Sequence, residues 1–387
     1  MRRNLLYNGS LAVLALLVAL ALAEGALRVA YGDKFGRRPG FIIGHQVLGW
    51  EPAPNLDHTF YGSDFAMEIR TDAEGHRLGA LGEVAADDEL IILCGDSNVF
   101  GWGVGTTETC ASDLDERVHG ASGGRVRVVN LGVPGYGTLQ SHLRLAEFLA
   151  DHASARIAAV FIVHAPNDPI DNVNSIGYHI GAWKVVDRQL KARSRSHLVN
   201  FAAYSWSIIK LKINPPRHET SDTGAIVHPY LRDIDFAFDT VLPKTLPRSV
   251  TMNGRPVALD SISAEDYSKT RTFKRRTLTR TQRDLMREGV TSFHRLLAGR
   301  GLKLFHIILP TAADWYAGEV MGLLEQTEPS AGNDVEVLGK YPDISRYPKP
   351  YMNAHSGRHY TPEFNRYWAK ALMDVLVGEN VVTPVQP

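Results

Sequence analysis

Short apolar and β-branched runs, separated by segments with helical periodicity, most constrain the fold of this chain. Three of these runs are Leu90–Cys94, Val126–Asn130 and Ala158–Val163, and the helical segments Glu108–His119 and Thr138–His152 lie between them. Strands that are buried on both faces and joined by helices form parallel sheets. The alternation therefore predicts an α/β fold.

The same alternation resumes near the C-terminal end of the chain. A helical segment at about Arg283–Leu297 precedes the apolar run Lys303–Leu309, and Val335–Leu338 suits a further short strand. Pro362–Leu376 has apolar residues at every fourth position and begins with a proline, which favours the first turn of a helix. Together the two regions predict a parallel sheet of about five strands.

The N-terminus carries an apolar segment that predicts export. Arg2 and Arg3 precede the stretch Leu11–Ala23, and a basic flank keeps that end of the chain in the cytoplasm. We interpret residues 1–30 as a signal anchor, with a signal peptide cleaved after Ala21-Leu22-Ala23 as the alternative. The first reading gives a single-pass protein of the cytoplasmic membrane with its main domain outside, and the second gives a secreted protein.

The rest of the chain divides by composition. Residues 31–86 are rich in glycine, proline and aromatic residues and are interpreted as a linker and irregular lead-in. Residues 87–212 and 283–380 hold the alternating pattern and form the two parts of one domain. Residues 213–282 lack that rhythm and contain Pro215, Pro216 and Pro243, so we interpret them as an insertion and a candidate cap.

Charge and cysteine content exclude several classes of protein. Basic and acidic residues balance at 42 each, which argues against a nucleic-acid partner, because such binding depends on neutralising phosphates. Two cysteines, Cys94 and Cys110, cannot form a disulfide scaffold or a cysteine zinc site by themselves. A single disulfide between them stays open.

Three loops that follow predicted strands carry groups suited to acyl chemistry. Gly95-Asp96-Ser97 follows the first strand and places a serine hydroxyl at the carboxyl edge of the sheet, where open α/β folds bind ligands. Gly135 follows the second strand and Asn167 the third. Each motif alone also suits an ordinary turn. Together they predict a nucleophile, Ser97, and an oxyanion hole made by the N–H groups of Ser97 and Gly135 and the Asn167 amide.

A serine nucleophile needs a base, and the chain has 15 histidines. His359, directly before the last predicted helix, is the best placed, and His355 is the alternative. His164 and His306 lie on predicted strands, so we expect both to be core residues.

The order and context of four of these residues resemble the SGNH/GDSL hydrolase superfamily. Its blocks supply a serine in Gly-Asp-Ser, a glycine, an asparagine in Gly-x-Asn-Asp and a C-terminal histidine, which match Ser97, Gly135, Asn167 and His359. Ala165 stands where the family usually has the glycine of the third block. The match covers residues 89–168 and 302–377. The resemblance implies a flavodoxin-like three-layer α/β/α fold with no metal and no organic cofactor.

The string from Gly95 to Val104 also looks like that of exported, N-terminally anchored members associated with cell-surface polysaccharides. One departure concerns the acid that orients the histidine. The family places an aspartate three residues before the histidine, and Ser356 stands there. Asp343 and Asp314 are the candidate substitutes, and a Ser–His dyad is the alternative.

These observations predict an exported SGNH-type serine esterase or O-acyltransferase. The expected substrate is a small acyl ester, acetyl above all, on a carbohydrate. The expected partners are that substrate, the membrane through the N-terminal helix, and a membrane protein that delivers acyl groups. The alternatives are a non-catalytic polysaccharide-binding protein on the same scaffold and a lipase or phospholipase.

Overall fold

The computed structural model describes the predicted sheet domain and the N-terminal helix. The described residues are 2–31, 41–45, 48–61, 65–169, 171–172, 196–213, 249–252, 255–258, 278, 280–309, 314–327, 334–340 and 359–385. Most of the predicted insertion at 213–282 lies outside them; its described part is the hairpin of β8 (Ser249–Met252) and β9 (Arg255–Ala258) and a few residues at its two ends. Its interpretation as a cap therefore stays a prediction.

The core of the molecule is a five-stranded parallel sheet. Its strands are β5 (Glu89–Cys94), β6 (Val126–Asn130), β7 (Arg156–His164), β10 (Lys303–Ile308) and β11 (Asp334–Lys340). They lie in the order β11-β10-β7-β5-β6, and every neighbouring pair is parallel. Numbered along the chain, this order is the 2-1-3-4-5 arrangement of flavodoxin-like sheets. The predicted fold class is confirmed.

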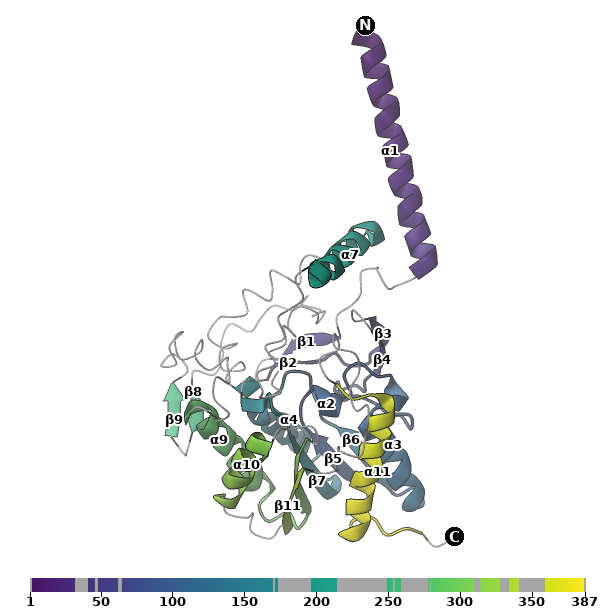
Figure 1. Ribbon diagram of the computed structural model, residues 1–387. Coiled ribbons are helices and arrows are strands. Elements are labelled where there is room, and N and C mark those ends of the chain that lie inside the picture. The colour runs from purple at the N-terminus through teal and green to yellow at the C-terminus, as the bar shows by residue number, and fades with distance from the viewer. Residues whose placement is uncertain are drawn as a thin grey trace.

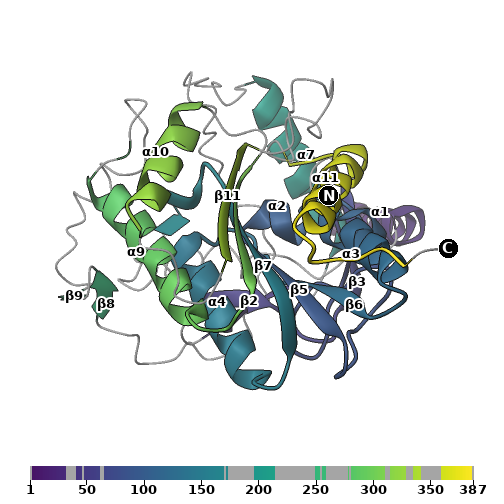
Figure 2. The ribbon, with the colours of Figure 1, turned by 90° about the horizontal axis from the view of Figure 1, so that it is seen from below.

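Helices cover both faces of this sheet (Figure 2). On one face α3 (Cys110–Ala121) and α11 (Pro362–Gly378) bury a cluster that includes Phe161, Phe305 and Trp368. On the other face α4 (Thr138–Asp151) and α9 (Arg280–Leu297) pack over a cluster that includes Ile92 and Phe293. Helix α10 (Asp314–Glu325), which the sequence analysis did not predict, shares a further cluster with α9.

The N-terminal helix α1 (Arg2–Tyr31) extends away from the sheet domain (Figure 1). Its segment Tyr7–Tyr31 has a mean hydropathy of 2.3 over its most apolar part, and none of that part is buried in the protein. At 1.5 Å per residue these 25 residues are long enough to cross a bilayer. The helix thus has the length and composition of a signal sequence or a membrane anchor.

The lead-in before the sheet is more regular than predicted. It contains two antiparallel hairpins, β1 (Ile42–His45) with β2 (Gly49–Pro52) and β3 (Asp57–Tyr61) with β4 (Ala66–Arg70). The expectation of an irregular segment was wrong here, because strands of four or five residues are too short to show a clear alternation. The hairpins instead pack through an aromatic cluster against the loops of the sheet. This cluster includes Phe41, Phe60, Phe100, Trp102 and Tyr136.

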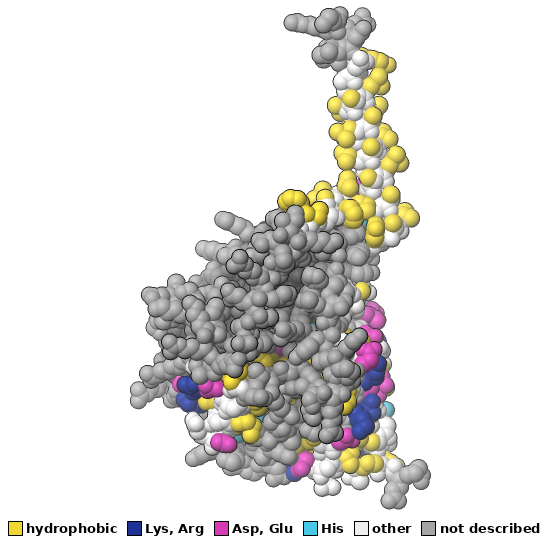
Figure 3. All heavy atoms as spheres, in the orientation of Figure 1, with side chains coloured by type: hydrophobic (Ala, Val, Ile, Leu, Met, Phe, Trp, Pro, Cys, Tyr) yellow, Lys and Arg dark blue, Asp and Glu magenta, His cyan; other side chains and the backbone are white. Residues whose placement is uncertain are grey.

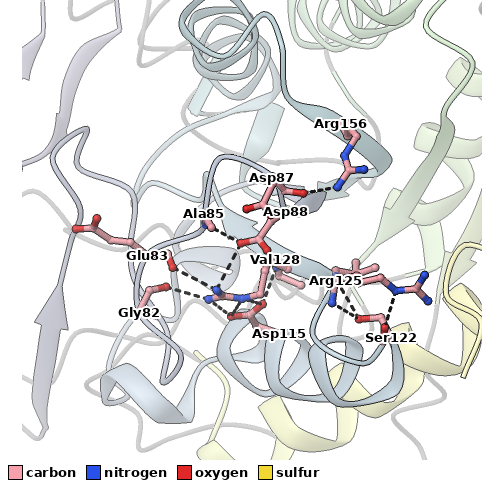
Figure 4. Close-up of polar contacts among 12 residues, drawn as sticks. Gly82, Glu83, Ala85, Asp87, Asp88, Asp115, Ser122, Arg125, Val128 and Arg156 are labelled. Atoms are coloured by element: carbon pink, nitrogen blue, oxygen red, sulfur yellow. Dashed lines mark hydrogen bonds and ion pairs between the residues drawn. The ribbon is translucent and has the colours of Figure 1, made fainter. Parts of the chain in front are cut away.

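A buried ion pair joins the lead-in to the edge of the sheet (Figure 4). Arg127 of β6 contacts the Asp115 carboxylate of α3, with Nε 3.0 Å from Oδ1 and Nη2 3.0 Å from Oδ2. The remaining guanidinium hydrogens reach the carbonyls of Gly82 and Glu83, and Asp115 also accepts the N–H of Val128. Because each charge is paired and hydrogen-bonded, the pair holds three segments together at the amino ends of the strands.

The two cysteines do not form the disulfide that the sequence left open. Cys94 ends β5 and Cys110 begins α3, and both are buried free thiols.

Candidate functional site

Ser97 lies at the carboxyl end of β5, as the sequence predicted. It is the first residue of α2 (Ser97–Phe100), and Asp96 caps that helix by accepting the Asn98 N–H at 2.9 Å. A side chain at Gly95 would place its Cβ 2.5 Å from a Val99 methyl group, so only glycine allows this tight turn. The turn fixes a buried serine at the edge of the sheet.

The structure brings His359 to this serine from the other end of the chain. His359 Nε2 lies 2.8 Å from Ser97 Oγ, and both side chains are buried. The residue is held in place because Thr361 caps α11 immediately afterward, accepting the Phe364 N–H at 3.1 Å. The imidazole ring centroid lies 6.0 Å from that of Trp102. The 2.8 Å separation of Ser97 Oγ and His359 Nε2 suits transfer of the serine proton to the imidazole.

Gly135 lies in the β6–α4 loop, which packs on the nucleophile turn. The Val133 N–H donates to the Gly95 carbonyl at 3.1 Å, so the two loops are directly joined. Gly135 itself has a φ of +81°, a conformation that favours glycine. Neither its N–H nor that of Ser97 donates to another residue in the part of the chain that the structure describes. Both therefore stay candidate donors for the predicted oxyanion hole.

The Asn167 amide has two carboxylate partners. Its Nδ2 lies 3.0 Å from Asp96 Oδ2 and 2.6 Å from Asp171 Oδ2, so both amide hydrogens are directed at carboxylates. The expected role of Asn167 in an oxyanion hole stays a prediction, because it needs one of these contacts to yield to a substrate. The sequence analysis missed Asp171, although its position four residues after Asn167 was the available signal.

A group of buried acids lies behind the nucleophile. Burial raises the pKa of Asp96, and it raises the pKa of Asp168 well above its ordinary value, where the nearby Asp96 charge adds to the effect. Burial, with the charges of both carboxylates, also raises the pKa of Tyr316 of α10. Asp96 Oδ2 lies 3.5 Å from Ser97 Oγ, farther than His359 Nε2. The imidazole is thus the nearer proton acceptor.

A chain of three buried histidines runs from the end of β7 to α9. His164 Nε2 lies 3.0 Å from His306 Nδ1, and His306 Nε2 lies 2.9 Å from His294 Nε2. Burial lowers the pKa of His164 to about 4 and holds the pKa of His306 well below its usual value. The two strand histidines are hydrogen-bonded core residues, as predicted.

Arg77 fixes the glycine-rich turn that follows α2. Its Nη1 donates to the carbonyls of Phe100 at 2.9 Å and Gly101 at 2.6 Å, and Nη2 donates to those of Glu68 at 2.9 Å and Val104 at 2.7 Å. The guanidinium also lies 4.7 Å from the centre of the Phe100 ring, and burial lowers its pKa to about 9. No sequence signal marked this residue, because its hydrogen-bond acceptors are main-chain oxygens.

The remaining predicted site residues are only partly placed. Asp343, Ser356 and the alternative base His355 lie outside the described residues, and Asp314 is placed by its backbone as the first residue of α10. The identity of the acid therefore stays a prediction. Among the described residues, no group of three or more His, Cys, Asp or Glu side chains is arranged to hold a metal ion.

Comparison with known proteins gives little further information. No family model matches the chain, and no curated protein matches it. Among solved structures, the carboxylesterase Cest-2923 from Lactobacillus plantarum WCFS1 aligns with a TM-score of 0.28 and 8% identity, over 85% of this chain and 99% of that one. A TM-score this low does not establish a shared fold or activity.

Proposed function

We propose that this protein is a serine esterase or O-acyltransferase that works through Ser97 and His359. The observation that carries the proposal is the 2.8 Å contact between Ser97 Oγ and His359 Nε2 at the carboxyl edge of a parallel sheet. In the loops around that serine lie the N–H groups of Ser97 and Gly135, neither of which donates to another of the described residues. Acyl transfer needs a nucleophile, a base and donors for an oxyanion.

In the proposed reaction, Ser97 Oγ attacks the ester carbonyl while its proton passes to His359 Nε2. The carbonyl oxygen becomes an oxyanion, which accepts hydrogen bonds from the N–H groups of Ser97 and Gly135. Asn167 adds a third donor when the substrate displaces one of its carboxylate contacts. The protonated imidazole then gives its proton to the leaving alcohol, and an acyl-enzyme forms on Ser97.

The second half of the reaction separates a hydrolase from a transferase. His359 removes a proton either from water or from a sugar hydroxyl, and the resulting oxygen attacks the acyl-enzyme. The acylated carbohydrate proposed as substrate rests on the resemblance of the Gly95–Val104 segment to exported members of the SGNH superfamily. The apolar helix α1 supports a membrane protein as acyl donor, because it has the length of an anchor.

A fluorophosphonate probe tests the nucleophile directly. We expect it to label the wild type and the control Ser154→Ala, since Ser154 is exposed before β7 at the opposite end of the sheet. Ser97→Ala should lose both labelling and ester turnover. Turnover close to wild type in that variant would refute the assignment. A wild type that neither reacts with the probe nor turns over acetylated sugars or aryl esters would favour the non-catalytic polysaccharide-binding alternative.

Mutation distinguishes between the candidate acids and a Ser–His dyad. If Asp343 or Asp314 orients His359, its replacement by asparagine should lower turnover by ~10³–10⁴, the scale of losing a triad acid. If the enzyme works as a dyad, those variants should change little and Ser356→Asp should raise the rate. The same acetylated-sugar panel, with product masses recorded, distinguishes transfer from hydrolysis.

A further inference from the structure

Helix α7 (His197–Ile213) is joined to the membrane-length helix α1 by one acidic side chain. Glu24 is the single acidic residue of α1, and its carboxylate accepts hydrogen bonds from Ser196 Oγ at 2.7 Å and from the N–H groups of His197 and Leu198 at 2.9 Å each. Arg28, one turn farther along α1, pairs with the same carboxylate at 2.8 Å. The N-terminus of α7 is thus capped by a residue of α1.

The position of Glu24 along α1 matches the far boundary of a bilayer. At 1.5 Å per residue, Arg3 and Glu24 lie about 32 Å apart along the helix, close to the ~30 Å hydrocarbon thickness of a membrane. With the two N-terminal arginines at one boundary, Glu24 and Arg28 reach the other. The start of α7 is then at the level where lipid headgroups meet acyl chains.

Helix α7 presents an apolar stripe at that level. Val199 is 53% exposed, Trp206 58% and Ile209 44%, and Ala202 is also exposed. These positions follow one another at intervals of three and four residues, so they share one face of the helix. Figure 3 shows hydrophobic side chains of α7 on the outer surface beside the base of α1.

We propose that α7 is a membrane-surface helix, which lies in the outer interface of the bilayer with this apolar stripe among the acyl chains. The occupant of the stripe is lipid because the stripe continues the exposed apolar surface of α1 at the point where α1 leaves the membrane. Tryptophan favours this interfacial depth. The inference requires α1 to be retained as an anchor, and it does not depend on the chemistry of Ser97.

Depth-dependent quenching tests the proposal on the full chain. Ile209→Cys is labelled with an environment-sensitive fluorophore and reconstituted in phosphatidylethanolamine–phosphatidylglycerol vesicles that contain doxyl-labelled lipid. Lys370→Cys, on exposed α11, is the control outside the membrane, and Leu14→Cys is the control within it. Unmutated protein corrects for background labelling, although Cys94 and Cys110 are buried.

We expect quenching at 209 to exceed that at 370 several-fold, and to be strongest with the doxyl group near the lipid headgroup, whereas quenching at 14 is strongest with the doxyl group near the end of the acyl chain. Quenching at 209 as weak as at 370 would overturn the proposal, whether or not the label at 14 is quenched. A label at 209 that is shielded from water yet unquenched by lipid would also overturn it, since a protein surface would then cover the stripe.

A second variant tests the junction. Glu24→Ala removes the cap of α7, so quenching at 209 should fall toward that at 370 while quenching at 14 persists. Unchanged quenching at 209 would refute the role of Glu24 in placing α7.

Discussion

The lowered pKa values of the buried histidines predict a folded domain that is sensitive to acid, and the contribution of His164 can be worked out. Burial lowers the pKa of His164 to about 4, whereas the pKa of a histidine in an unfolded chain is ~6.5. Between these values the unfolded state binds a proton that the folded state does not. The free energy of unfolding must therefore fall as the pH decreases through this window.

The linkage relation gives the magnitude. Between about pH 7.5 and about pH 4.5, the shift at His164 alone costs the folded state ~2.5 kcal/mol. The buried acids act in the opposite direction, because a raised pKa at Asp96 and Asp168 means that the folded state binds their protons more readily. The pH dependence of the wild type alone does not isolate the histidine.

A comparison with His164→Gln isolates it. Glutamine keeps a hydrogen-bonding amide near His306 but has no proton to gain in this range. Urea unfolding of both full-length proteins in detergent micelles, followed by tryptophan fluorescence, gives the free energy of unfolding at each pH. We expect the wild type to lose ~2.5 kcal/mol more than the variant over the range.

Parallel pH curves for the two proteins would refute this reasoning. They would mean that the folded state holds no unprotonated His164 below pH 6.5. His142, whose pKa burial also lowers to about 4, is present in both proteins and cancels from the difference.

Three further predictions concern the site and the topology. Asn167→Ala should lower turnover by ~10²–10³ if the Asn167 amide stabilises the oxyanion, whereas a change confined to KM would mean that Asn167 binds the substrate in its ground state. Asp171→Asn tests whether the Asp171 carboxylate positions that amide, and the expected result is a change in kcat with KM unchanged. Gly135→Ala should lower the free energy of unfolding in urea by ~1–2 kcal/mol and lower turnover at least tenfold. The control is Gly124→Ala, because Gly124 also has a positive φ but lies beside His119 at the other end of the sheet. This control should show the loss of stability without the loss of turnover. A reporter that works only outside the cytoplasm should be active when fused after Pro387, and activity of a cytoplasmic reporter there would reverse the predicted topology.

The sheet and its loops were predictable because their signals are local. Val126–Asn130 is a continuous buried run, and the structure places β6 over the same residues. The positions of Ser97, Gly135 and Asn167 follow from the same reasoning, since each lies in the loop after a parallel strand and such strands end at one edge. The pairing of Ser97 with His359 was anticipated from the resemblance and from the place of His359 before the last helix.

The features that the sequence analysis missed depend on contacts between distant segments. Arg77 bonds to carbonyls 23 to 27 residues later, and nothing in the local pattern indicates which main-chain oxygens a tertiary fold leaves without partners. The orientation of the Asn167 amide is similar, because it is set by Asp96, 71 residues earlier, as much as by Asp171. Helix α7 has no clear amphipathic pattern of its own, and its junction with α1 depends on Glu24, 173 residues before His197.

The separation of Ser97 and His359 by 262 residues has a consequence for biogenesis. Ser97, its turn and three of the five strands are complete after less than half of the chain has been synthesised. His359 follows only after β10 and β11, and its place depends on α11 docking beside α3. A nascent chain therefore carries the hydroxyl long before it carries the imidazole, and the pair cannot form until His359 has been synthesised. Truncation anywhere before His359 should leave Ser97 without its imidazole partner.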